Sequence, residues 1–213
     1  MKCYRGFAHA GCVMGVAALA ALSASCGDFV RRGQSPSFVI LDAITAASGA
    51  KPDEFGHVLQ SDVITNVRSG TDDVLVPTVF EDLGEATAHI ALKDPGTPSS
   101  PNTPSAINEV TITRYRVVFK RSDGRNTPGI DVPYPFDGAV TATIGTNGAT
   151  FNFVIVRAQA KMEGPLKALR GGGGNMLIST IAEVTFYGRD QAGNDVTASG
   201  QISVNFADWG DPQ

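Results

Sequence analysis

Two adjacent segments near the C-terminal end alternate apolar and polar residues so regularly that they restrict the fold more than any other feature. Every second residue from Ala182 to Phe186 is apolar within residues 180–190, and the same alternation runs through residues 195–208. The link between them, DQAGND, has the composition of a turn. Successive side chains of a strand point to opposite faces, so a period of two indicates half-buried strands. The sequence therefore predicts a terminal antiparallel strand pair.

Shorter segments with strand character precede this pair along the chain. In residues 109–121 the apolar parity changes near Arg114, which predicts a β-bulge or a strand shared between two sheets. Asn147-Gly148 is a strong hairpin signal because both residues tolerate positive φ. Residues 163–170 are expected to form one helical turn. The strands are expected at 37–43, 57–66, 84–93, 109–121, 139–145, 149–157, 180–190 and 195–208.

The number and spacing of these strands define the expected fold class. Seven or more short strands separated by turns predict an all-β chain, and we expect an immunoglobulin-like antiparallel β-sandwich over residues 37–213. The domain is long enough to bury a core without disulfides or metals. One domain is therefore expected.

The first 25 residues have the organisation of a secretory leader. Residues 1–9 carry Lys2 and Arg5 and no acidic residue, and residues 10–22 are apolar or small and uncharged. A basic start, a short apolar stretch and small residues before a cleavage site are typical of signal peptides. The apolar run is shorter than the about 20 residues of a membrane span. We expect residues 1–25 to form a helical signal peptide that is cleaved.

Cys26 closes the sequence LSASC, which resembles the bacterial lipobox. The resemblance implies that its sulfur is acylated, for example with palmitate, and that residues 26–36 form a tether between the lipid and the domain. Leucine stands four residues before the cysteine instead of the usual three, and ordinary cleavage after Ser25 is the alternative. The other two of the three cysteines lie in the leader, and lipid attachment explains a lone mature thiol better than a disulfide does.

The chain as a whole resembles a group of uncharacterised bacterial lipoproteins that share the CGD start and the VTFYGRDQAGNDV ending. The ending also resembles the last hairpin of bacterial immunoglobulin-like domains, which often carry a D-x-x-G-N turn, and residues 112–124 resemble the middle strand of a fibronectin-type sandwich. These resemblances imply a location and a fold, and no activity.

Motifs for catalysis or cofactor binding are missing from the sequence. There is no G-x-S-x-G, H-E-x-x-H or P-loop, and Gly171–Gly174 is not followed by Lys-Ser/Thr. A zinc site or a general base would have to use His57 or His89, and the alternation around His89 places it on a polar face. We expect no catalytic residue, cofactor or metal, and we predict that the protein is not an enzyme.

Charged residues offer two minority interpretations. The mature chain retains 15 of the 17 basic residues against 21 acidic ones, a charge near −6, which does not suit a nucleic-acid partner. Aspartates recur in turns, and calcium at Asp190, Asn194 and Asp195 is the alternative to a purely structural turn. A second group of charged residues is basic and could bind anions; it comprises Arg114, Arg116, Lys120, Arg121 and Arg125. Strand parity instead predicts that the aromatic residues among them face the core and that the charges face water.

Aromatic residues in the loops are the remaining binding candidates. Tyr134 and Phe136 stand beside prolines in VPYPFDG, and Trp209 follows the last expected strand. Each is expected to pack over an end of the sandwich, with sugar or protein binding as the alternative for the loop.

The predicted function is that of a lipid-anchored cell-envelope protein with a non-catalytic binding or structural role. It would contact the membrane through the lipid on Cys26, in the outer membrane if the cell has two, and a protein or glycan partner. One alternative is an accessory subunit that binds by strand pairing, recognisable by an apolar surface patch or an uncovered edge. Another is a hydrolase with an unrecognised site, recognisable by a deep pocket with converging titratable groups.

Overall fold

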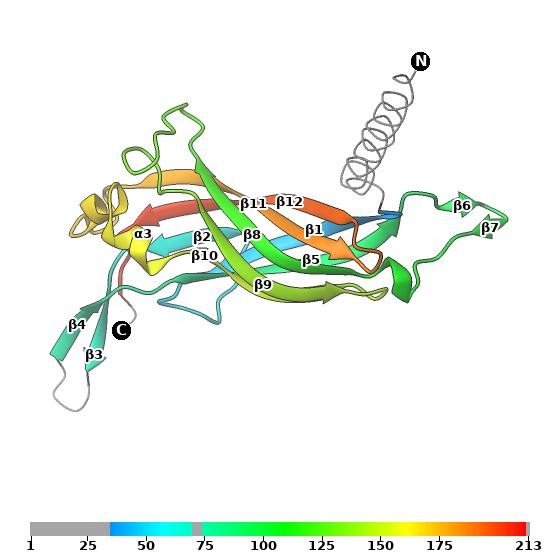
Figure 1. Ribbon diagram of the computed structural model, residues 1–213. Coiled ribbons are helices and arrows are strands. Elements are labelled where there is room, and N and C mark those ends of the chain that lie inside the picture. Colours follow the sequence, from blue (N-terminus) through cyan, green and yellow to red (C-terminus); the bar gives the residue numbers. More distant parts are fainter. Residues whose placement is uncertain (1–34, 70–73, 212–213) are drawn as a thin grey trace, which may run out of the picture.

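The computed structural model describes residues 35–69 and 74–211, and it shows an all-β protein (Figure 1). The expected all-β class is therefore confirmed. The predicted signal peptide, Cys26 and most of the predicted tether lie outside the described residues. The strands of the two main sheets are β1 (Ser37–Ala47), β2 (Val58–Asp62), β5 (Asp82–Leu92), β8 (Val110–Lys120), β9 (Phe136–Ile144), β10 (Ala149–Val156), β11 (Ile178–Asp190) and β12 (Asp195–Ala207).

Two small hairpins and three short helical segments complete the described chain. The hairpins are β3 (Thr65–Ser69) with β4 (Val74–Thr78), and β6 (Gly96–Thr97) with β7 (Ser100–Pro101). The helical segments are η1 (Ala106–Asn108), α3 (Ala158–Met162) and η2 (Leu166–Leu169). The last of these confirms the predicted helical turn. No helix in the described ranges is long and apolar enough to cross a membrane.

The main strands form two sheets, one of three strands in the order β1-β5-β10 and one of five strands in the order β2-β12-β11-β8-β9. Neighbours within the sheets are antiparallel except β2 and β12, which are parallel. The predicted terminal pair is confirmed as β11 and β12, with Ala182 opposite Ile202. Its inward residues are buried, as the alternation indicated.

Aromatic side chains from both sheets meet in the core between them. The ring of Tyr115 on β8 lies 5.2 Å from that of Phe153 on β10, and Phe186 on β11 lies 5.2 Å from both Phe151 and Phe153. Edge-on ring pairs at such distances stabilise beyond the area they bury. The hydroxyl of Tyr115 also accepts a hydrogen bond of 3.2 Å from the Val154 amide, which links the two sheets.

The predicted irregularity in the strand at 109–121 is a β-bulge. The register of β8 against both neighbours shifts between Ile112 and Arg114. Against β11 this leaves Thr113 as the extra residue, whereas against β9 the extra residue lies on β9. Buried Ile112 and buried Tyr115 can then both face the core although their sequence parity differs. A second register shift, in β1, leaves Asp42 as the extra residue.

The hairpin predicted at Asn147-Gly148 is wrong, although the turn itself exists. Gly148 has φ of 78° and its amide donates to the Gly145 carbonyl, as in a tight turn. The strands on either side then separate, because β9 pairs with β8 in one sheet and β10 pairs with β5 in the other. The turn signal identified the local bend but could not reveal that the chain changes sheets there.

The elongated body has two different ends (Figure 1). The first strand begins at Ser37, whose partner is Leu92 at the end of β5, beside the small β6–β7 hairpin. The β3–β4 hairpin projects from the opposite end, where α3 and the C-terminal segment also lie. We call the β3–β4 hairpin, residues 65–69 and 74–78, the arm.

Candidate functional site

The arm exposes four large apolar side chains close together. Its exposed residues and their exposed fractions are Val67 (38%), Val74 (56%), Leu75 (57%) and Val76 (43%). An isolated two-stranded hairpin is only marginally stable in water, and clustered exposed apolar residues mark interaction surfaces. The arm is therefore the strongest candidate for a binding element.

The register of the arm places its apolar residues on both faces. Val67 pairs with Val76, and directly paired residues share a face. Val74 lies two residues from Val76 and so joins them. Leu75 and Pro77 alternate to the other face, where they stand opposite Arg68 and Asn66. Each face of the arm thus carries apolar side chains.

Asp62 fixes the turn by which the chain enters the arm. Its Oδ2 accepts a hydrogen bond of 2.6 Å from the Thr65 hydroxyl, and its Oδ1 accepts one of 3.1 Å from the Trp209 amide. Burial raises the pKa of Asp62, and these hydrogen bonds offset that effect only in part. The carboxyl group therefore joins the end of β2, the start of β3 and the C-terminal segment.

A second carboxylate holds the C-terminal segment against the arm. The two oxygens of Asp211 accept hydrogen bonds from the backbone amide and the side-chain Nδ2 of Asn66, both at 2.7 Å. This two-pronged contact connects residues 145 positions apart in the sequence. It ties β3 to the body of the protein where the arm begins.

A buried ion pair lies close to these contacts, and we call Asp62, Asp211, Asp82 and Lys161 together the root of the arm. The Nζ of Lys161 on α3 is 2.7 Å from Oδ1 of Asp82 at the start of β5, and the side chains are 1% and 0% exposed. The same carboxylate accepts hydrogen bonds from the Ser61 hydroxyl at 2.6 Å and the Gly49 amide at 2.9 Å. Burial raises the pKa of Asp82, against the opposing effects of Lys161 and Ser61. The pair joins α3, β5 and β2 at one point.

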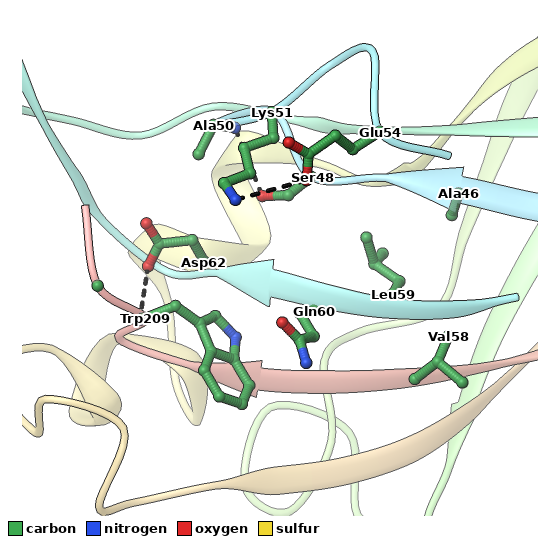
Figure 2. A pocket seen from close by; sticks show the side chains of 11 residues that line it. Ala46, Ser48, Ala50, Lys51, Glu54, Val58, Leu59, Gln60, Asp62 and Trp209 are labelled. Atoms are coloured by element: carbon green, nitrogen blue, oxygen red, sulfur yellow. Dashed lines mark hydrogen bonds and ion pairs between the residues drawn. The ribbon is translucent and has the colours of Figure 1, made fainter. Parts of the chain in front are cut away.

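A cavity of about 350 Å³ opens beside these contacts. Figure 2 shows Lys51, Ser48 and Glu54 on one side of it, and Asp62 with Trp209 on the other. Lys51 and Glu54 form an exposed ion pair of 3.4 Å, and Asp62 is engaged as described above. Trp209 therefore packs at the end of the sheets, as expected, where it also lines this cavity.

The two histidines in the described part of the chain, His57 and His89, lie outside the arm. His57 is exposed in the bend before β2. His89 is half-exposed on the outer face of β5, and its Nδ1 lies 2.8 Å from Oδ1 of Asp42, the bulged residue of β1. Bulges often re-aim a side chain in this way. An Asp–His pair can orient a general base, so the hydrolase alternative stays a prediction attached to these two residues.

The basic group on β8 is engaged in surface ion pairs. Arg114 and Arg116 both contact Asp137, at 3.2 and 2.7 Å, while Tyr115 between them is buried. Lys120 pairs with Glu183, and Arg121 and Arg125 both pair with Asp123. Aromatic residues point to the core and charges to water, as parity predicted. Because β8 lies between β9 and β11, these charges do not protect a sheet edge.

The turn considered as an alternative calcium site is closed by hydrogen bonds among its own residues. Asp190 accepts bonds from the amides of Ala192 and Asn194, at 3.0 and 2.8 Å, and from the Asn194 side chain at 2.8 Å. Asp195 pairs with Arg189 at 3.0 Å. Among the described residues, no group of three His, Cys, Asp or Glu side chains is arranged to hold a metal ion.

The two aromatic residues of VPYPFDG, Tyr134 and Phe136, differ in their burial. Phe136 is buried and lies under the guanidinium of Arg157, 4.4 Å from its ring centroid. Tyr134 is half-exposed, and its ring covers Gly129, where a side chain would collide with it. The expectation of packing is confirmed fully for Phe136 and in part for Tyr134.

Sequence reasoning missed the arm and the buried pair. The segment VLVP at 74–77 has the β-branched composition of a strand and follows a Gly-Thr-Asp-Asp turn composition, so a hairpin signal was present. Asp82 stood in an acidic pair and Lys161 in a polar stretch, and neither position shows periodicity that would predict burial. The comparisons with protein-family models, curated proteins and solved structures find no match to this chain.

Proposed function

We propose that the protein is a lipid-anchored component of a bacterial cell envelope that binds a protein partner through the arm. The proposed role is non-catalytic. The proposed partner is a protein, as in the accessory-subunit alternative. The anchor is the lipid on Cys26, with residues 26–36 as the tether. In a cell with two membranes we place it in the outer one, because Gly27 after the cysteine is not an acidic retention signal.

The fold proposed for this domain is immunoglobulin-like. The first, second and fifth long strands form one sheet, and the third, fourth, sixth and seventh form the other, counting β1, β5, β8, β9, β10, β11 and β12. This division agrees with the assignment of strands A, B and E to one immunoglobulin sheet and of C, C′, F and G to the other. Such a scaffold presents loops and hairpins at its two ends.

The single observation that carries the binding proposal is the apolar surface of the arm. Four valine and leucine side chains between 38% and 57% exposed project from the end of the domain opposite Ser37, where the tether joins. An anchored domain would therefore hold the arm away from its attachment point. Valine and leucine side chains have no hydrogen-bonding groups to match sugar hydroxyls, so a protein partner suits the arm better than a glycan.

The anchor and the partner are tested in the cell that carries the gene. The full chain is labelled with a palmitate analogue and fractionated, beside a Cys26→Ser variant and a Leu75→Lys variant. We expect label and membrane association in wild type and Leu75→Lys but not in Cys26→Ser. We also expect wild type extracted in mild detergent to migrate as a larger complex than Leu75→Lys does.

Two results would contradict the proposal separately. Absence of label in wild type, or unchanged membrane association of Cys26→Ser, would show that the anchor is wrong. Identical migration of wild type and Leu75→Lys at the size of the single chain would show that the arm holds no partner.

A further inference from the structure

Lys161 and Asp82 place an amine against a carboxyl group at a point that is closed to water. Nζ lies 2.7 Å from Oδ1, and the two side chains are 1% and 0% exposed. Fixed geometry and exclusion of water both favour reaction between two such groups. Lys120 and Glu183 are as close, at 2.6 Å, but their side chains are 52% and 33% exposed. Burial, and not distance, therefore distinguishes the Lys161–Asp82 pair from a surface ion pair.

The hydrogen bonds of the Lys161 side chain suit an amide nitrogen better than an ammonium group. An ammonium group has three N–H donors, and among the described residues Nζ of Lys161 has one hydrogen-bond partner, Oδ1 of Asp82. A buried donor without an acceptor is costly, and so are two buried charges. The nitrogen of a secondary amide carries a single N–H and no charge. Condensation of the two side chains would therefore remove two buried donors and both charges.

Asp82 carries the carboxyl group that is placed to react. Burial raises the pKa of Asp82 and so favours its neutral acid, which is the form that condenses with an amine. Asp62 also lies within electrostatic reach of Lys161, but its oxygens accept hydrogen bonds from the Thr65 hydroxyl and the Trp209 amide. Within the described ranges the Lys161 amine has no hydrogen bond to Asp62. Asp82 is therefore the expected reaction partner.

We infer that the side chains of Lys161 and Asp82 condense to an intramolecular amide that links α3 covalently to β5. The ion pair described above is the state of the two groups before the reaction. First, the ammonium group passes one proton to Oδ1, with which it is in contact. The neutral Nζ then attacks Cγ, so that a C–N bond forms and the electron pair of the C–Oδ2 double bond moves to Oδ2.

The surrounding hydrogen bonds support the remaining steps. The Ser61 hydroxyl donates to Oδ2 at 2.6 Å and stabilises the negative charge that develops there. A second proton then moves from Nζ to Oδ1, the C–Oδ1 bond breaks, and the double bond to Oδ2 forms again. Oδ1 leaves as one water molecule beside the Gly49 amide, which donates to it at 2.9 Å. The reaction needs no oxidant, reductant or further reactant.

The cross-link would stabilise a domain that has no cysteine after residue 26. It joins positions 79 residues apart, and like a disulfide it restricts the unfolded chain. Loss of either residue would therefore cost the linked chain more stability than it costs the ion pair alone. The inference goes beyond the proposed binding role of the arm and does not depend on it.

Peptide mass spectrometry of the full chain, purified from the cell that carries the gene, tests the inference. After denaturation and digestion with a protease, we expect the peptide with Lys161 to be joined to the peptide with Asp82. Its mass should be the sum of the two peptide masses less one water molecule. We expect no joined peptide for the exposed Lys120–Glu183 pair, nor for a Lys161→Arg variant, which keeps the positive charge but lacks the amine.

The wild-type chain decides the main point, whether or not Lys161→Arg folds. Separate Lys161 and Asp82 peptides, each of its own full mass, would overturn the inference and leave a buried ion pair. A link from Lys161 to Asp62 would also overturn it, because the reacting carboxyl group would be the wrong one. A link between Lys120 and Glu183 in similar yield would show that burial does not select the pair, and would overturn the argument on which the inference rests.

Ser61 gives a test of the reaction itself. The linked fraction is followed over time after pulse labelling of the chain in the cell, in wild type, Ser61→Ala and Ser61→Thr. Ser61→Ala removes the donor to Oδ2 and should slow the linkage at least about tenfold, as loss of an oxyanion donor does. Ser61→Thr keeps the hydroxyl and should keep the rate of wild type. Equal rates in all three chains would overturn the reaction as written.

Discussion

The arm and its root distribute polar and apolar groups in opposite ways. The root buries a lysine and an aspartate completely, whereas the arm exposes valine and leucine side chains. A buried ion pair adds little net stability over an apolar pair, but loss of one partner is costly. Exposed apolar side chains add little to the stability of the free domain. The root therefore specifies one arrangement of the chain, whereas the arm leaves its apolar surface exposed, as the proposed binding role requires.

The largest expected effect comes from breaking the buried pair. Asp82→Ala leaves the Lys161 ammonium buried without its counter-ion and leaves Ser61 and Gly49 without their acceptor. We expect a loss of about 3–5 kcal/mol in the free energy of unfolding, measured by urea denaturation. The matched control is Asp195→Ala, which breaks an exposed pair with Arg189 and should cost less than about 1 kcal/mol. Equal losses in the two variants would show that burial of the pair has no special role.

A double variant distinguishes the charge from the hydrogen bonds. Lys161→Met alone leaves the Asp82 carboxylate buried without its counter-ion. Lys161→Met with Asp82→Asn leaves a neutral amide that can still form hydrogen bonds with the Ser61 hydroxyl and the Gly49 amide. We expect the double variant to be more stable than the Lys161→Met variant. A double variant that is the less stable of the two would contradict this account of the root.

The next effect concerns Asp62, which braces the turn into the arm. Asp62→Ala removes the acceptor of the Thr65 hydroxyl and the Trp209 amide, and we expect a loss of about 1–3 kcal/mol in the free energy of unfolding. Asp62→Asn keeps an acceptor and should lose less. An Asn variant as unstable as the Ala variant would show that the carboxylate charge, and not hydrogen bonding, is what matters.

The same residue gives a prediction on pH. Because burial raises the pKa of Asp62 above its ordinary 3.8, the folded state binds more protons than the unfolded state in the range above 3.8. The contribution of Asp62 to stability is therefore fully present below pH 3.8 and is lost as pH rises through the raised pKa. Denaturation at several pH values should show the difference between wild type and Asp62→Asn shrinking as pH rises. A difference that grows with pH would show that the pKa is lowered instead.

The strands and the bulge could be predicted because each depends on a local pattern. Alternation identified β11 and β12, and the parity change near Arg114 indicated the irregularity that the structure shows as a bulge at Thr113 against β11. The change of sheet after Gly148 could not be predicted, since a turn signal does not say with which strand each flanking segment pairs. The burial of Lys161 depends on Asp82, 79 positions away, and nothing local to either residue indicates the other.

A smaller effect is expected where the C-terminal segment meets the arm. Asp211→Ala removes both part-buried hydrogen bonds from Asn66. The start of β3 then loses its contact with the C-terminal segment. We expect a loss of about 1 kcal/mol that is confined to local opening. Hydrogen exchange of the Asn66 amide should accelerate several-fold while that of the Val184 amide in the core keeps its rate. Acceleration at both amides would show that the contact supports the whole fold.

The smallest effect on stability is expected in the arm itself. Val74→Lys and Leu75→Lys replace exposed side chains whose neighbours in the free domain are few, so each should change the free energy of unfolding by no more than about 0.5 kcal/mol. The same substitutions should abolish the larger complex, because an ammonium that is buried against an apolar partner surface loses its hydration. Val184→Lys on buried β11 is the contrasting control, since it should unfold the domain. If Val74→Lys or Leu75→Lys destabilised the free domain by several kcal/mol, the arm would belong to the structural core and not to a binding surface, and the contrast between the arm and its root would fail.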